Sequence, residues 1–174
     1  MKALFYSLIF LFIGNLTSTA QKSEWTWAKG AGGSKHDYGT KIATDLAGNV
    51  YLTGCFVSDT ISFGGKTLTN SGKGSSDVFV VKFDASGKLL WSADIGGSAD
   101  DRGLSICADN SGNAWLTGDF ESNAINIGGN TLINAGGSDV FIAHFDPSGN
   151  VLWAQGAGGT DRDHHVVHPA RPRG

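Results

Sequence analysis

The sequence predicts an all-β fold of short antiparallel strands, and three observations support this class. Glycine accounts for 26 of the 174 residues, roughly twice its usual share of about 7 %. Short apolar and β-branched runs alternate with turn-forming segments, which is typical of strands joined by hairpin turns. One long segment repeats the segment before it, and neither copy shows the periodicity of a helix.

The internal repeat begins at a tryptophan. Trp27, Trp91 and Trp153 each open a related phrase that ends in Gly-Gly. Residues 27–90 align with residues 91–152, with a two-residue gap near Lys73, and about half of the aligned residues are identical. Such identity at a fixed period indicates duplication. We therefore expect both units to fold alike.

Each unit contains the signals of four strands in two hairpins. In the first unit, residues 39–45 and 50–56 flank one turn, and residues 78–84 and 89–95 flank another. Residues 61–68 predict a small additional ribbon between the hairpins, and the second unit repeats the pattern. Four strands in two hairpins are the content of one β-propeller blade, so we expect an incomplete propeller of about two blades. A β-sandwich or a solenoid of the same strands is the alternative.

The repeat divides the chain into five segments. After Asp163 the repeat pattern stops, and prolines and histidines become frequent. We interpret this end as a truncation, a frameshift or an unrelated tail. The expected segments are a signal peptide (1–20), a first repeat or blade (21–90), a second repeat (91–152), the start of a third (153–163) and an aberrant or disordered tail (164–174).

The first twenty residues predict export. Lys2 precedes an apolar run over residues 3–13, and Ser18 and Ala20 provide the small residues of a cleavage site before Gln21. The run is shorter than the about 20 residues that a transmembrane helix needs. We therefore expect a secreted or cell-surface protein without a transmembrane helix, with the periplasm as the alternative location.

One short phrase, Asp-x-[Ala/Ser]-Gly with Asn or Lys after the glycine, recurs four times. A calcium loop is one interpretation, but each copy offers one carboxylate where Ca²⁺ takes six to eight oxygens. A hairpin turn explains the phrase better, because Asp bonds to nearby backbone and Gly adopts a positive φ. The predicted structural turn residues are Asp45, Gly48, Asn49, Asp84, Gly87, Asp109, Gly112, Asn113, Asp146, Gly149 and Asn150.

Residues that recur at one repeat position are interpreted as architectural. This applies to Asp37, Asp101 and Asp163, for which we expect loop-tying hydrogen bonds, and to Asp77 and Asp139 before the third strand. The repeated tryptophans are expected to pack rather than to stack on ligands. Cys55 and Cys107 occupy different repeat positions and predict buried free thiols rather than a disulfide.

Two further features concern binding. The ribbon that carries Phe63 and Ile127 is expected to be exposed and to contact a partner, because insertions in a repeat often form its binding face. His164 and His168 have a spacing that suits a metal on a helix, but Pro169 would end such a helix. We therefore expect neither a metal site nor a cofactor.

The strand phrases resemble a known family. Gly-Asn-Val-Tyr-Leu-Thr-Gly (48–54), Gly-Asn-Ala-Trp-Leu-Thr-Gly (112–118), Ser-Asp-Val-Phe-Val-Val-Lys-Phe-Asp (76–84) and Ser-Asp-Val-Phe-Ile-Ala-His-Phe-Asp (138–146) are similar to the bacterial seven-bladed β-propeller (SBBP) repeat. The resemblance covers about residues 25–163. It implies a secreted or surface-exposed propeller, without catalytic residues shared across the family.

Function is predicted only as a class. No cluster of Lys or Arg forms a basic stripe, which argues against a nucleic-acid partner. We expect a non-catalytic binding or structural module for a protein or glycan, whose open faces need further blades or self-association. The alternative is an enzyme of the propeller lyase or lactonase type whose active site lies in blades outside this chain.

Overall fold

The computed structural model describes residues 26–163, and every regular element in this range is a β-strand. The described residues contain no helix that could cross a membrane. The strands of the first half are β1 (Asp37–Thr44), β2 (Val50–Phe56), β3 (Thr60–Phe63), β4 (Lys66–Thr69), β5 (Asp77–Phe83) and β6 (Leu89–Ile95). Those of the second half are β7 (Asp101–Ala108), β8 (Ala114–Phe120), β9 (Ala124–Ile127), β10 (Asn130–Ile133), β11 (Asp139–Phe145) and β12 (Val151–Ala157).

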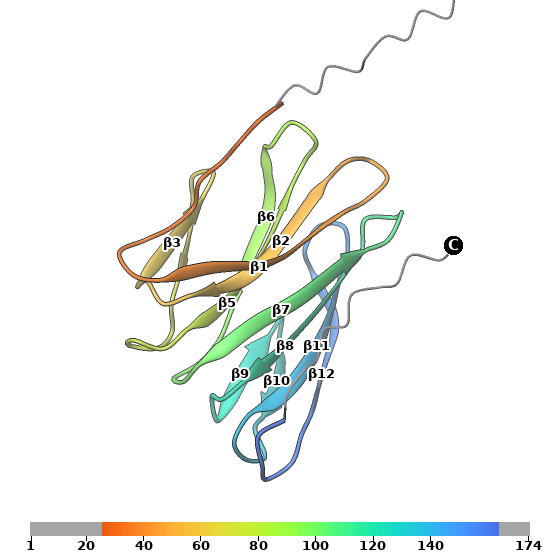
Figure 1. Ribbon diagram of the computed structural model, residues 1–174. Helices are drawn as coiled ribbons and strands as arrows, with labels where there is room; N and C mark the ends of the chain where they lie inside the picture. Colours follow the sequence, from red (N-terminus) through yellow and green to blue (C-terminus); the bar gives the residue numbers. More distant parts are fainter. Residues whose placement is uncertain (1–25, 164–174) are drawn as a thin grey trace, which may run out of the picture.

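The strands form two four-stranded sheets and two small ribbons, shown in Figure 1. The first sheet has the order β1-β2-β5-β6, and the second has the matching order β7-β8-β11-β12. All neighbouring strands are antiparallel. The ribbons β3–β4 and β9–β10 interrupt each sheet at the same repeat position, and β4 contacts β6 as β10 contacts β12. The all-β fold of incomplete propeller blades is thereby confirmed.

The sheets do not begin and end where the sequence repeat does. β6 completes the first sheet although most of it lies beyond residue 90, and β12 completes the second sheet although most of it lies beyond residue 152. The predicted boundaries at 90/91 and 152/153 therefore cut through the last strand of each sheet. The blades span residues 37–95 and 101–157, and each takes its fourth strand from the next sequence unit.

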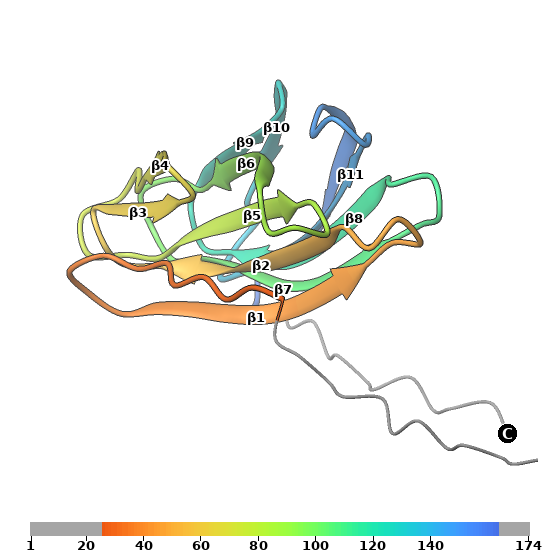
Figure 2. The same cartoon turned by 90° about the horizontal axis from the view of Figure 1, so that it is seen from above.

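The two sheets pack face to face around a shared apolar core. β7 contacts β1, β2 and β5 of the first sheet, and Figure 2 shows β1 and β7 running close together. β5 is buried along its whole length because one face lies against the second sheet and the other lies under the β3–β4 ribbon. Alternate residues of β11 are only half-buried, because one of its faces has no sheet against it in the described part of the chain.

Candidate binding surface

The predicted turn residues form four hairpin turns of one design. Asp45 Oδ1 accepts hydrogen bonds from the backbone N–H groups of Ala47 and Asn49, and Asn49 Nδ2 donates to Asp45 Oδ2 at 2.7 Å. Gly48 has a φ of 78°, which favours glycine. The turns at Asp84, Asp109 and Asp146 repeat this arrangement of the Asp Oδ1 atom. These hydrogen bonds hold the pKa of all three carboxyls below its usual value.

A second set of aspartates ties each loop between repeats to its sheet. Asp101 Oδ2 accepts from Gly97 N at 2.8 Å and from Ser122 Oγ at 2.7 Å. Asp37 makes the same bonds with Gly33 and Ser58. Asp163 Oδ2 accepts from Gly159 N at 2.8 Å. These carboxylates therefore fix loops, and among the described residues no group of three His, Cys, Asp or Glu side chains is placed to hold a metal ion.

The aspartates before β5 and β11 are buried. Asp77 Oδ2 accepts from Ser71 N at 2.6 Å, and Asp139 Oδ2 accepts from Ala135 N at 2.8 Å. The Oδ1 atom of each is buried without a hydrogen bond. Burial raises the pKa of Asp77 to about 6, although the bond from Ser71 opposes the shift. Asp77 and Asp139 thus hold the loop that leads into the central strand.

At one end of the contact between the sheets, polar side chains of the first sheet donate hydrogen bonds to carbonyl groups in turns of the second sheet. Trp91 Nε1 donates to the Pro147 carbonyl at 3.1 Å, and the indole stacks on Phe145 at 5.7 Å. Tyr51 Oη lies 2.8 Å from the Gly112 carbonyl oxygen. Lys82 Nζ lies 3.1 Å from the Pro147 oxygen and 3.4 Å from the Gly112 oxygen. Each of the two carbonyls thus lies within reach of two donor groups, and the single hydroxyl proton of Tyr51 is shared between the Gly112 carbonyl at 2.8 Å and Asp45 Oδ2 at 3.1 Å.

Burial shapes the chemistry of these donors. Tyr51 is fully buried, and burial together with the bond to Asp45 raises the pKa of its hydroxyl above the ordinary value. Lys82 is buried over the Tyr51 ring at 4.9 Å, and burial lowers its pKa although Asp45 and Asp146 oppose the shift. Tyr51 and Lys82 thus place two polar groups inside the otherwise apolar contact between the two sheets.

We call the side of a sheet that faces the preceding repeat its leading face. In the second sheet this face is covered by the first sheet: Ile106 is 2 % exposed, and Leu116 and Phe145 are buried beside it. In the first sheet the equivalent Ile42 is 60 % exposed, and Val50 and Leu52 are only partly buried. A cleft of about 280 Å³ lies here, lined by side chains of β1, β2, β5 and the ribbon β3–β4.

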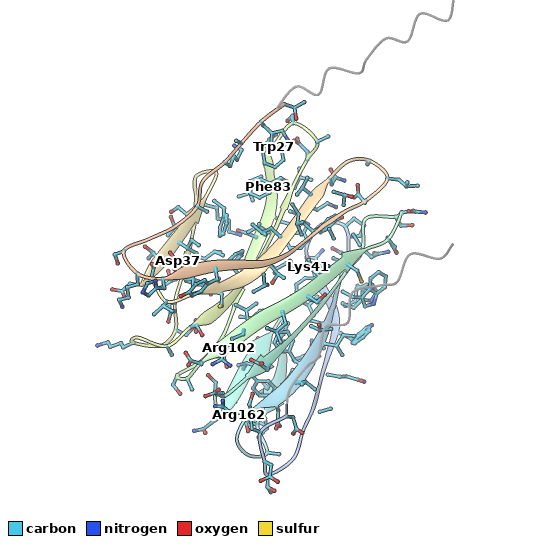
Figure 3. All side chains as sticks on the ribbon, viewed as in Figure 1. Trp27, Asp37, Lys41, Phe83, Arg102 and Arg162 are labelled. Atoms are coloured by element: carbon cyan, nitrogen blue, oxygen red, sulfur yellow. The ribbon has the colours of Figure 1, made fainter. Side chains whose placement is uncertain are left out.

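One short segment lies against this cleft. Trp27 donates from Nε1 to the Ala85 carbonyl at 3.1 Å and contacts Phe83 at 5.9 Å, and Figure 3 shows Trp27 beside Phe83. Trp91 makes the equivalent bond to Pro147 one repeat later. Trp27 therefore occupies the position that a tryptophan of a preceding sheet takes.

We call the opposite side of a sheet its trailing face. In the second sheet a row of rings crosses this face: His144 stacks on Trp115 at 4.3 Å and meets the edge of Trp153 at 5.6 Å. Trp115 and His144 are half-buried, and Trp153 is 37 % exposed. In the first sheet the equivalent row is Tyr51, Lys82 and Trp91, which the second sheet covers. The row is not apparent from the sequence, since it depends on strand register.

A charged cluster occurs in the second repeat. Arg102 lies within 3.5 Å of carboxylate oxygens of Asp119, Asp100 and Glu121, and Arg162 reaches Glu121 at 2.7 Å. Figure 3 shows both arginines at the second sheet. Arg102 is about one-third exposed and Arg162 more than half, so these pairs are partly solvated, and each such pair contributes only about 0–1 kcal/mol. The cluster links strands β7 and β8 to the loop residues Asp100, Glu121 and Arg162.

The expected exposure of Phe63 and Ile127 is wrong. Phe63 is 3 % exposed and Ile127 is 1 % exposed, because each ribbon folds back and turns these side chains onto its own sheet. The polar neighbours Ser62, Thr67 and Asn126 are exposed instead. Any partner contact of the ribbons therefore involves their polar sides.

The two cysteines differ in their exposure. Cys55 is a buried free thiol as expected, whereas Cys107 is free but exposed on the trailing face. The signal segment, His164 and His168 lie outside the described residues.

Comparison with known proteins supports the repeat. Residues 30–54 match the family model described as the SBBP beta-propeller repeat. An uncharacterized WD repeat-containing protein of Acanthamoeba polyphaga mimivirus is 28 % identical, over 73 % of this chain and 11 % of the relative. The regulatory protein FlaEY of Caulobacter vibrioides is 29 % identical, over 71 % of this chain and 13 % of the relative. The chain thus spans a small part of the length of these relatives.

Proposed function

We propose that this chain, which carries a β-propeller repeat of the SBBP type, is an exported, non-catalytic module that holds a protein partner against the open faces of its sheets. One observation carries the proposal: the leading face of the first sheet exposes apolar residues that the same fold buries one repeat later. Ile42 is 60 % exposed where Ile106 is 2 % exposed. Contiguous apolar surface of this kind marks interaction sites.

The polar residues support a binding role over chemistry. The repeated aspartates are occupied by backbone donors in turns and loops, as the bonds of Asp45 and Asp101 show. The Arg102 cluster is closed by ion pairs. Ile42 on the leading face and Trp153 on the trailing face remain accessible, and apolar and aromatic side chains of this kind form the centre of protein interfaces.

Export is proposed from the N-terminal sequence alone. Lys2, the apolar run that follows it, and Ser18 and Ala20 before Gln21 form the pattern of a cleaved signal peptide. Mass spectrometry of the protein from the extracellular fraction tests this. We expect a mature chain that begins at Gln21, and a chain that retains Met1 and stays in the cytoplasm would refute export.

The binding role is tested by a photo-crosslinking amino acid at residue 42. Position 46 is the control, because Leu46 is 79 % exposed in a turn and its equivalent Asn110 stays exposed when a sheet covers the leading face. Irradiation of the exported protein in its native medium should give a covalent protein adduct from position 42 and none from position 46. Equal labelling at both positions, or none, would contradict a docking face.

A further inference from the structure

The two open faces of this chain are the two halves of a contact that the chain already forms internally. The trailing face of the first sheet covers the leading face of the second sheet. The leading face of the first sheet and the trailing face of the second carry equivalent residues but have no sheet against them in residues 26–163. The internal contact therefore serves as a template for what each open face fits.

The leading faces match residue by residue. The covered face presents Ile106, Leu116 and Phe145, and the open face presents Ile42, Leu52 and Phe83 at the equivalent positions. The turns that receive donors are also equivalent: Gly48 corresponds to Gly112, and Ala85 corresponds to Pro147. The open leading face of the first sheet thus offers equivalent apolar side chains and equivalent carbonyl acceptors to those of the covered leading face.

The trailing face of the second sheet carries the complementary groups. His144 occupies the position of Lys82, whose Nζ reaches the carbonyls of Gly112 and Pro147. The Nε2 atom of His144 is buried and makes no hydrogen bond within the described part of the chain. Trp153 occupies the position of Trp91, which donates to the Pro147 carbonyl. Trp153, which is 37 % exposed, therefore lies where a following turn would supply an acceptor, whereas His144 Nε2 is covered within its own chain, where Trp115 and Trp153 lie beside its ring.

Trp27 holds one of these acceptors. Its Nε1 donates to the Ala85 carbonyl, the equivalent of the Pro147 carbonyl that Trp91 uses. The segment from Trp27 to Ala31 lies on the cleft without strand pairing, and its residues other than Trp27 are exposed. An incoming tryptophan of another sheet would compete with Trp27 for this position.

From these observations we propose that a second copy of the chain places the trailing face of its second sheet on the leading face of the first sheet, with Trp153 of that copy replacing Trp27 at the Ala85 turn. This rests on the proposed function and names the partner. The contact joins two different surfaces, so it is heterologous and either continues or closes into a ring. Propellers close with about four to eight blades, so copies that each contribute the two blades described here would close a ring as about two to four copies.

Two single variants and their mixture test the proposal. Ile42→Asp places a charge on the leading face, and Trp153→Ala removes the ring at the edge of the trailing face. Each variant alone should be monomeric by light scattering and native mass spectrometry, at concentrations where the full mature chain associates. A mixture of the two should form a heterodimer, because each variant retains the face that the other has lost.

Matched controls use exposed apolar residues outside the proposed contact. Leu46→Asp and Ile133→Ala should leave association unchanged, because Asn110 and Thr69, their equivalents in the other repeat, remain exposed. Circular dichroism confirms that each variant is folded. A wild-type chain that stays monomeric over the whole concentration range, or a mixture that gives no heterodimer, would overturn the proposal.

If Trp153 of a second copy competes with Trp27, removing Trp27 should strengthen self-association rather than weaken it. Trp27→Ala should strengthen association, and the double variant with Trp153→Ala should be monomeric. Weaker association of Trp27→Ala would show that Trp153 does not replace Trp27, which would overturn that part of the proposal. The double variant separates specific from unspecific association. Association through the uncovered cleft alone would persist in the double variant, whereas association through Trp153 would be lost.

Cys107 provides a readout that needs no substitution. It is exposed on the trailing face, whereas Cys55 is buried. In the presence of a non-thiol reductant, the rate of Cys107 alkylation should fall several-fold as the protein concentration rises. A constant rate would contradict burial of this face by a second copy. An adduct at residue 42 to a different protein, with a monomeric chain, would refute self-association while the proposed binding role stands.

Discussion

The contact between the sheets predicts that one substitution has two different costs at equivalent positions. Ile106 is 2 % exposed between the sheets, and Ile42 occupies the same repeat position at 60 % exposure. Both lie in the first strand of their sheets, β7 and β1, so the intrinsic strand preference of isoleucine over alanine applies to both and cancels in the difference.

The expected magnitudes follow from burial. Ile106→Ala removes three buried carbons at about 0.8 kcal/mol each, and the cavity left behind raises the total cost to about 3–4 kcal/mol. Ile42→Ala removes atoms that are mostly in water already, so its cost should be below about 1 kcal/mol. The free energy of unfolding should therefore differ by about 2–4 kcal/mol between the two variants.

Urea-induced unfolding measures this difference. The experiment belongs at low protein concentration, where self-association does not contribute to stability. Ile106→Val and Ile42→Val form a milder pair, for which the same ordering should hold with roughly a third of the difference. Costs that agree within about 0.5 kcal/mol would refute the packing of the first sheet on Ile106, because additive surface effects are of that size.

Three further predictions concern the same contact and its turns. Thermal unfolding should show a larger loss of stability for Gly149→Ala than for Gly129→Ala. The two φ values are 87° and 90°, but a Cβ at residue 149 would lie 2.7 Å from the Trp91 ring, whereas one at residue 129 meets nothing within 4 Å. Equal costs would contradict the packing of Trp91 on this turn. Lys82→Met and Tyr51→Phe should each change stability by less than about 1 kcal/mol, because the Gly112 carbonyl keeps one donor in either variant. The double variant should lose about 1–3 kcal/mol more than the sum of the two single costs, because that buried acceptor is then unpaired. Strictly additive costs in this double-mutant cycle would refute the shared acceptor. Burial raises the pKa of Asp77 from 3.8 to about 6, so this carboxyl binds its proton more tightly in the folded state and its contribution to stability should rise as the pH falls from 6 to 4; Asp77→Asn should flatten that rise, and an unchanged slope in the variant would count against it. The turn carboxyls act in the opposite direction: because their pKa is lowered from 3.8, their contribution to stability is lost only as the pH falls below 3.8 and through that lowered pKa.

Strand positions and turns could be predicted from the sequence because their causes are local. The Asp45 and Gly48 pattern specifies its own hydrogen bonds and its own positive φ within a few residues. The ribbons had a usable signal as well: Ile61 and Phe63 alternate with Thr60 and Ser62, and this two-residue alternation is typical of a strand that buries one side. Treating the ribbon as an exposed insertion overlooked that alternation.

The sequence predicted that two blades leave open faces, but the residues that lie side by side on those faces could not be predicted, because they depend on how distant strands align. Trp153 lies opposite His144 only because the β11–β12 pairing shifts register between His144 and Phe145. No local pattern marks that shift. The place where a sheet begins is also absent from a comparison of repeats, since identical units can be divided at any point along their period.

The offset between sequence unit and sheet has a practical consequence for protein engineering. An excised segment 27–90 would contain the start of β6 but lose its end, so the polypeptide would fold with a frayed outer edge. Segment 37–95 carries all four strands of one sheet and is the better cassette for grafting. Segment 37–95 leaves out Trp27, which lies outside both sheets, so the Ala85 carbonyl at the first turn of an array of such cassettes would lack its tryptophan donor.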